Sequence, residues 1–157
     1  MPEASPARIV ADADVLAADL LVGGPAREAL DHVRRHSWLT LVASEPLLDD
    51  TEAVVAEVAD PALAADHRER LEAAIERVDH PDGDHPALAS AYRGGAAHLL
   101  SYDEALRSAE TGLSIQPHAQ LSVRPPDAFA RLFDPESLYP VVHDGAEYPG
   151  PDTDPRA

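Results

Sequence analysis

The stretch ARIVADADVLAADLL, residues 7–21, decides the fold. Its apolar run Ile9–Ala11 is typical of a buried strand, and the apolar residues that resume at Val15 are spaced as in a helix. We therefore predict a strand over residues 7–12 and a helix over 15–22 that ends at a glycine pair. Between them lie Asp12 and Asp14. Carboxylates at the edge of a core need a partner, a proton or a cation, because burying an isolated charge is unfavourable.

The rest of the chain repeats this alternation of strands and helices. Further strands are predicted over residues 38–43, 98–100 and 119–123, and helices over 25–36, 46–58, 61–78, 85–95, 103–108 and 125–133. Ser44 is the expected N-cap of the helix that starts near Pro46. His67 falls on the apolar face of the 61–78 helix, where we interpret it as a packing residue rather than a ligand. Alternating strands and helices with short loops favour an α/β fold, a three-layer α/β/α sandwich with a mostly parallel sheet.

The C-terminal part of the sequence differs from the rest. We assign residues 1–134 to one domain and residues 135–157 to an acidic tail rich in proline and glycine, which has no periodicity. We expect this tail to be mobile, with Leu138, Tyr139, Val141 and Val142 as candidates for docking onto the domain.

The composition is strongly acidic. Asp and Glu number 29 against 12 basic residues, all of them arginine, and the formal net charge is -17 over 157 residues. Two interpretations compete: a surface that attracts a basic partner, or a general coat suited to the high intracellular salt of a halophilic archaeon. The acids are spread over nearly every segment, which favours the coat, since salt near 1 M shortens the Debye length to about 3 Å and screens self-repulsion.

Several classes of protein are excluded by what the sequence lacks. There is no cysteine, so disulfides, thiolate catalysis and cysteine-bound zinc are ruled out. The histidines show no His-Glu-x-x-His spacing, which argues against a zinc hydrolase. No signal peptide and no apolar run of membrane-spanning length is present, so we expect a cytoplasmic protein with no membrane partner.

Four carboxylates are expected to converge on one edge of the sheet. Asp12 ends the first strand and Asp103 follows a later one, and the carboxyl ends of parallel strands share an edge. Asp50 lies on a helix that begins beside that edge, and Asp84 opens the helix that leads to the strand before Asp103. No lysine or strand-end arginine balances these charges, so Mg²⁺ or Mn²⁺, which prefer oxygen ligands, are the expected compensation. The alternative is that acids fall at strand ends by chance in so acidic a chain.

The order of four sequence blocks resembles the PIN-domain nucleases. These blocks are VADADVL, SEPLLDDTEAV, DHPALASAYRGGAAHLLSYDEAL and VRPPDAFARLF, and the resemblance covers residues 8 to about 133. Asp14 stands where the family usually has Asn or Ser, and Asp50 stands where it usually has Glu. Asp84 opens the Asp-x-x-aliphatic-Leu-Ala-x-Ala pattern, and Ser101 and Asp103 match a Thr/Ser-x-Asp pattern.

The resemblance implies a ribonuclease that hydrolyses RNA phosphodiester bonds. Mg²⁺ or Mn²⁺ would be held by Asp12, Asp84 and Asp103, with Asp50 as a direct or water-mediated ligand. Ser101 would hydrogen-bond a ligand or a metal-bound water, and Asp14 would either orient the metal ligands or cap the helix that follows it. Arg93, Arg107 and Arg124 are candidates for phosphate contacts.

The resemblance also implies partners. In the toxin branch of the family an antitoxin peptide enters the acidic crevice, and a homodimer is common, for which the apolar faces of helices 25–35 and 61–78 are candidates. Two other classes stay open. The chain could be a PIN-like binding or regulatory module with weak or no catalysis, which the Asp at position 50 and the lack of a basic groove favour. A phosphate-accepting receiver domain fits poorly, because such a domain needs a lysine late in the chain.

Overall fold

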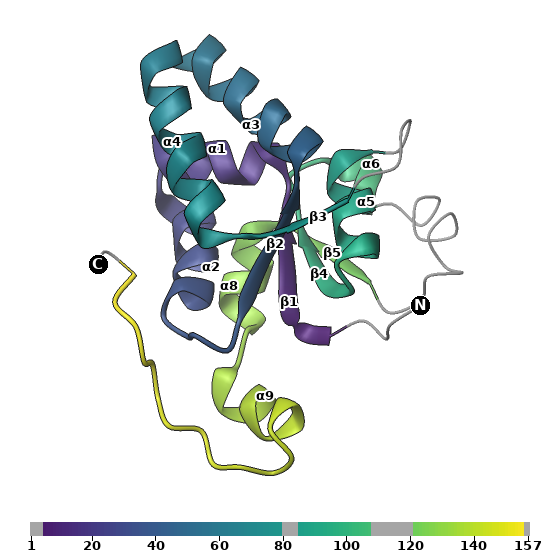
Figure 1. The fold of residues 1–157 in the computed structure, drawn as a ribbon. Helices are drawn as coiled ribbons and strands as arrows, with labels where there is room; N and C mark the ends of the chain where they lie inside the picture. The colour runs from purple at the N-terminus through teal and green to yellow at the C-terminus, as the bar shows by residue number, and fades with distance from the viewer. Residues whose placement is uncertain (1–4, 80–84, 108–120, 156–157) are drawn as a thin grey trace.

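The computed structural model describes residues 5–79, 85–107 and 121–155. A five-stranded sheet lies at its centre, ordered β3-β2-β1-β4-β5, and every strand pair is parallel (Figure 1). The strands are β1 (Ser5–Ala11), β2 (Thr40–Ser44), β3 (Glu76–Val78), β4 (Ala96–Leu100) and β5 (Ser122–Arg124). The helices are α1 (Ala13–Leu21), α2 (Gly24–Arg34), α3 (Glu45–Val58), α4 (Pro61–Ala74), α5 (Pro86–Arg93), α6 (Glu104–Arg107), α8 (Pro126–Leu132) and α9 (Pro135–Val142). The predicted α/β fold with a parallel sheet is confirmed.

Strand β1 occupies the middle of the sheet, as expected for a continuous apolar run with both faces covered. It pairs with β2 on one side and β4 on the other, with Ile9 opposite both Leu41 and His98. Ile9 and Val10 are fully buried although their side chains point to opposite faces. The first strand is therefore the centre of the core.

Helices cover both faces of the sheet (Figure 1). Helix α5 packs against β1, β2 and β4 on one face, while α1, α2 and α8 lie on the other. Helices α3 and α4 pair with each other and lead the chain from β2 to β3. The core between these layers is aliphatic and rich in alanine, and Phe129 is its largest fully buried side chain.

The apolar faces proposed for a dimer are used inside the domain. On α2, Ala26, Ala29, Leu30 and Val33 are buried, and on α4 the buried residues are Ala64, His67 and Leu71. These residues pack within the domain, and the homodimer stays a prediction.

The predicted helix over residues 61–78 is wrong at its C-terminal end. Helix α4 stops at Ala74, Ile75 is extended, and residues 76–78 form the edge strand β3 beside β2. The spacing of Leu71, Ile75 and Val78 fits a helix. Ile75 and Val78 are β-branched, however, and such residues favour a strand where a partner strand is present. An ion pair also links Glu76 of β3 to Arg8 of the central strand β1.

Residues 135–142 form the helix α9, and residues 143–155, which have no regular structure, also contact the domain. On α9, Leu138 and Val142 pack against the core, and the Tyr139 ring lies 5.2 Å from that of Trp38. Docking is thus confirmed for these three residues, whereas Val141 is 73% exposed.

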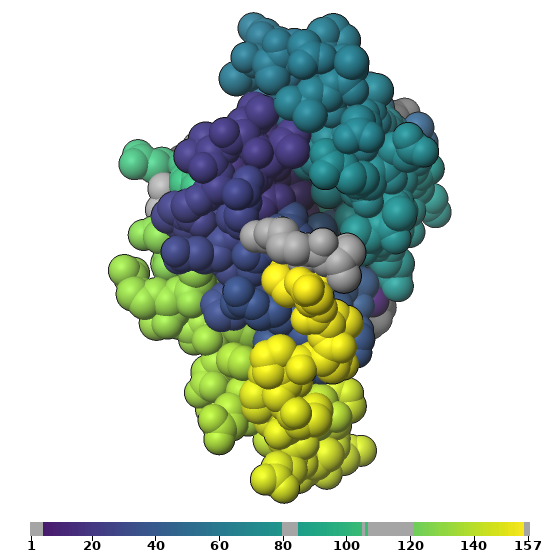
Figure 2. Space-filling model, turned by 90° about the vertical axis from the view of Figure 1, so that its left-hand side faces the viewer, coloured from purple at the N-terminus to yellow at the C-terminus, as the bar shows by residue number. Residues whose placement is uncertain are grey.

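The segment after α9 runs along the C-terminal end of α2 (Figure 2). The Tyr148 hydroxyl donates to Nε2 of His36 at 2.6 Å, because Nδ1 of His36 must donate to the His32 carbonyl at 2.7 Å. Asp152 accepts from the Ser37 N–H at 2.7 Å, and its own N–H donates to the Arg35 carbonyl at 2.9 Å. This C-terminal segment therefore forms part of the folded surface.

Candidate functional site

Asp12 ends the central strand and begins the next helix. Its N–H donates to the Leu100 carbonyl at 2.8 Å, which continues the pairing of β1 with β4 by one residue. Its Oδ1 accepts from the Ala13 N–H at 2.8 Å and so caps α1, which explains why that helix starts at residue 13 rather than 15. The N-cap is therefore Asp12, and the alternative in which Asp14 caps the helix is wrong. The Asp12 side chain is almost fully buried.

Ser101 joins the two acids that end neighbouring strands. It is fully buried directly after β4, and its N–H donates at 3.0 Å to the carbonyl of Arg124, the last residue of β5. Its hydroxyl donates to Oδ2 of Asp12 at 2.8 Å and accepts from the Asp103 N–H at 3.0 Å. One buried hydroxyl thus fixes the Asp12 carboxylate and the backbone that carries Asp103.

Asp14 lies in the first turn of α1 and faces the same edge. Its Oδ2 accepts from the Tyr102 N–H at 3.2 Å, while its Oδ1 is buried without a hydrogen-bond partner among the described residues. Burial is the main cause that raises the pKa of Asp14 from 3.8 to about 6, and the negative charge of Asp12 adds to it. The N–H groups of Tyr102 and Val15 act in the opposite direction, and Asp103 contributes a small further increase. No positively charged side chain is among the causes that shift the pKa of Asp14.

The other predicted acids are placed differently. Asp103 is exposed at the end of β4, close enough for its charge to act on Asp14. Asp50 is exposed in the second turn of α3, and no hydrogen bond or ion pair among the described residues involves it. Asp84 lies outside the described residues. The structure thus brings together Asp12, Asp14, Ser101 and Asp103, which we call the acidic edge.

The acidic edge offers few carboxylates to a divalent cation. Among residues 5–79, 85–107 and 121–155, no three His, Asp or Glu side chains could hold one metal ion. Mg²⁺ commonly keeps several waters and binds proteins through only one or two carboxylates. The buried Oδ1 of Asp14, which has no hydrogen-bond partner among the described residues and lies beside Asp12, fits such a hydrated ion.

Sequence reasoning missed Tyr102, which lies between Ser101 and Asp103. Its backbone positions Asp14, and its ring is 43% exposed at the acidic edge. Burial, together with the charges of Asp14 and Asp127, raises the pKa of its hydroxyl above the usual value. The Thr/Ser-x-Asp pattern includes this position but does not specify which residue occupies it.

The fold and this edge define a parallel α/β domain with acids at the carboxyl ends of its central strands. Residues 3–156 match a family of unknown function, DUF7384, and the chain belongs to that family. The matched region includes α9 and the C-terminal segment. No curated protein matches the chain, and no solved structure does. Within the described ranges, no helix is both long and apolar enough to cross a membrane.

Proposed function

We propose that the protein is a ribonuclease that needs Mg²⁺ or Mn²⁺ and hydrolyses RNA phosphodiester bonds at the acidic edge. One observation carries the proposal: the buried Ser101 hydroxyl holds the Asp12 carboxylate and the Asp103 N–H, and Asp14 on the same edge has a buried carboxylate oxygen without a partner among the described residues. The resemblance of four ordered sequence blocks to the PIN-domain nucleases supports the same chemistry.

The protein's own residues supply position and charge. The hydrogen bond from Ser101 holds the Asp12 side chain in one rotamer. The carboxylate is therefore already oriented at the edge of the sheet before a ligand binds. The same hydroxyl fixes the backbone of Asp103, and the Tyr102 N–H holds one oxygen of Asp14. A divalent cation bound there would act as a Lewis acid on water and on the phosphodiester. Asp12 and Asp14 are the residues that would hold it, with Asp103, Asp50 and Asp84 as further proposed contributors.

Cleavage of a labelled single-stranded RNA tests this proposal. The wild type should cleave in Mn²⁺ and lose activity in EDTA, and Asp12→Asn and Asp103→Asn should each lower the rate at least about 100-fold, because each removes a charge from the cation site. Glu57→Gln is the matched control, since it removes one exposed carboxylate from α3 and should leave the rate unchanged. Cleavage that survives both aspartate substitutions, or that proceeds in EDTA, contradicts the proposal.

Calorimetric titration with Mn²⁺ separates the enzyme from the alternative of a binding module. Binding that is lost in Asp12→Asn, together with RNA cleavage, supports the nuclease. Binding of Mn²⁺ without cleavage of any RNA tested would support a PIN-like regulatory module that has kept its cation.

A further inference from the structure

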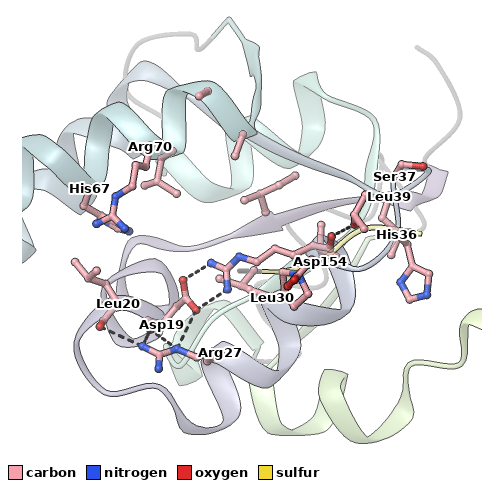
Figure 3. Close-up of a pocket in the computed structure, with 18 residues that line it drawn as sticks. Asp19, Leu20, Arg27, Leu30, His36, Ser37, Leu39, His67, Arg70 and Asp154 are labelled. Atoms are coloured by element: carbon pink, nitrogen blue, oxygen red, sulfur yellow. Dashed lines mark hydrogen bonds and ion pairs between the residues drawn. The ribbon is translucent and has the colours of Figure 1, made fainter. Parts of the chain in front are cut away.

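A large cavity lies at the C-terminal end of α1, away from the cap of that helix at Asp12. It has a volume of about 830 Å³ and is bounded by α1, α2, β2, α4 and the C-terminal segment (Figure 3). In Figure 2 it is the hollow between the helices drawn in purple and blue and α4 in teal. This volume falls in the range of small-molecule sites, about 300–1,000 Å³. The C-terminal residues Thr153–Pro155 form one rim.

The charge around the cavity is the reverse of the charge of the whole chain. Among the described residues that line it, arginines number three and aspartates two, whereas acids exceed bases by 29 to 12 in the whole sequence. The buried Asp19 is already engaged: it accepts from Arg34 at 2.9 Å, and Arg27 donates to the Asp19 carbonyl at 2.7 Å.

Arg70 is the cation best placed to take an external anion. Its ion pair with Asp66, at 3.2 Å, joins two side chains that are 60% and 64% exposed, one helical turn apart on α4. Such exposed pairs are weak, so the Arg70 guanidinium can exchange Asp66 for a ligand at little cost. Figure 3 shows Arg70 and His67 extending from α4 over the side of the cavity formed by Asp19 and Leu20.

His67 gives an independent sign of an unfilled polar site. Its side chain lines the cavity, is 95% buried, and has an Nδ1 without a hydrogen-bond partner among the described residues. Buried polar atoms are nearly always paired, so an unpartnered imidazole on a cavity wall indicates a missing ligand or water. Burial, together with the charge of Arg70, lowers the pKa of His67, so the ring is neutral at neutral pH.

We propose that this cavity binds a small organic anion with an apolar body. The anionic group binds Arg70, and the body packs against Leu20, Leu30 and Leu71. His67 hydrogen-bonds the ligand through its ring. The proposal does not depend on the ribonuclease proposal, because none of the residues of the acidic edge lines the cavity.

The fluorescent anion 8-anilinonaphthalene-1-sulfonate is a direct probe, since it joins a sulfonate to an apolar body of suitable size. We expect the folded protein to bind one molecule, with blue-shifted emission, in calorimetry and fluorescence titration. Arg70→Gln should weaken binding about tenfold, the loss of one charge-assisted contact. Arg131→Gln, which removes an exposed arginine of α8, is the matched control and should bind like the wild type.

Two further measurements test whether charge selects the ligand and whether the ligand contacts His67. The uncharged dye N-phenyl-1-naphthylamine should bind at least about tenfold more weakly than the anion if charge selects the ligand. The ring resonances of His67 in the wild type should shift on saturation with the anion, whereas those of His143 should not. Absence of binding, equal affinity for both dyes, equal affinity of Arg70→Gln and wild type, or unmoved His67 resonances would each overturn the proposal.

Discussion

Replacing Asp14 by asparagine is expected to stabilise the metal-free protein at pH 7.5. Asparagine has nearly the same shape, and its side-chain oxygen can still accept the Tyr102 N–H. The carboxyl of the wild type must instead ionise in a partly buried position beside Asp12, which raises its pKa from 3.8 to about 6. Between these two pH values the unfolded chain has lost the Asp14 proton and the folded chain keeps it. The wild type therefore loses stability as pH rises through this window and keeps the loss above it.

The size of the effect follows from the two pKa values. They differ by about two pH units, and each unit is worth about 1.4 kcal/mol, so the gain from Asp14→Asn at pH 7.5 is at most about 3 kcal/mol. Salt reduces this figure, because it screens the repulsion from Asp12. Near pH 4 the folded carboxyl is protonated in the wild type, and the two proteins should differ by well under 1 kcal/mol.

Urea unfolding in EDTA at pH 4 and pH 7.5 measures this difference. Glu57→Gln is the control, since an exposed carboxylate should change stability by no more than about 0.5 kcal/mol at either pH. If Asp14→Asn is no more stable than the wild type at pH 7.5, or if its advantage is the same at both pH values, ionisation of Asp14 is not the cause. On the proposed function, Mn²⁺ should then stabilise the wild type more than Asp14→Asn.

Three other substitutions have definite expected outcomes. Arg34→Met should lower the free energy of unfolding by about 3 kcal/mol in urea titrations, because it leaves the buried Asp19 with Arg27 alone; a loss below 1 kcal/mol would show that Arg34 is not needed there. Ser101→Ala should cost about 1–3 kcal/mol by the same measurement, since the Asp12 carboxylate and the Asp103 N–H both lose a buried partner; unchanged stability would mean that water replaces the hydroxyl. On the proposed function, the Tyr102 ring stacks on an RNA base, so Tyr102→Ala should raise the KM for single-stranded RNA about tenfold with little change in kcat. Tyr102→Phe keeps the ring and should keep the wild-type KM. Equal KM values for the two variants would exclude stacking.

The parallel sheet and the positions of Asp12 and Asp103 at its edge could be predicted from the order of strands and helices in the sequence. Alternating apolar strands and helices predict parallel strands, and parallel strands bring their carboxyl ends together, which is why Asp12 and Asp103 are neighbours. The capping role of Asp12 was missed because Asp12 and Asp14 both precede an apolar helix. The hydrogen bond from Ala13, which distinguishes them, depends on where β1 stops.

Features that depend on distant partners could not be predicted in this way. Strand β3 exists because β2 offers it an edge, although the spacing of its residues also suits a helix. Likewise, the sequence around Tyr148 and Asp152 has no periodicity, since its order comes from contacts with His36 and Ser37. The cavity is defined by elements that lie far apart along the chain, so none of its residues stands out locally.

The attachment of the C-terminal segment to α2 sets an order of events during synthesis. Arg35 and Ser37 leave the ribosome long before Asp152 is made, and domains begin to fold from their N-terminal parts as the chain emerges. The end of α2 therefore stays uncovered until residues 152–155 have been made, and this rim of the cavity forms after the walls that precede it in the chain. Slow translation of residues 143–155 would prolong the time in which the cavity wall formed by Arg34 and Leu30 meets solvent directly.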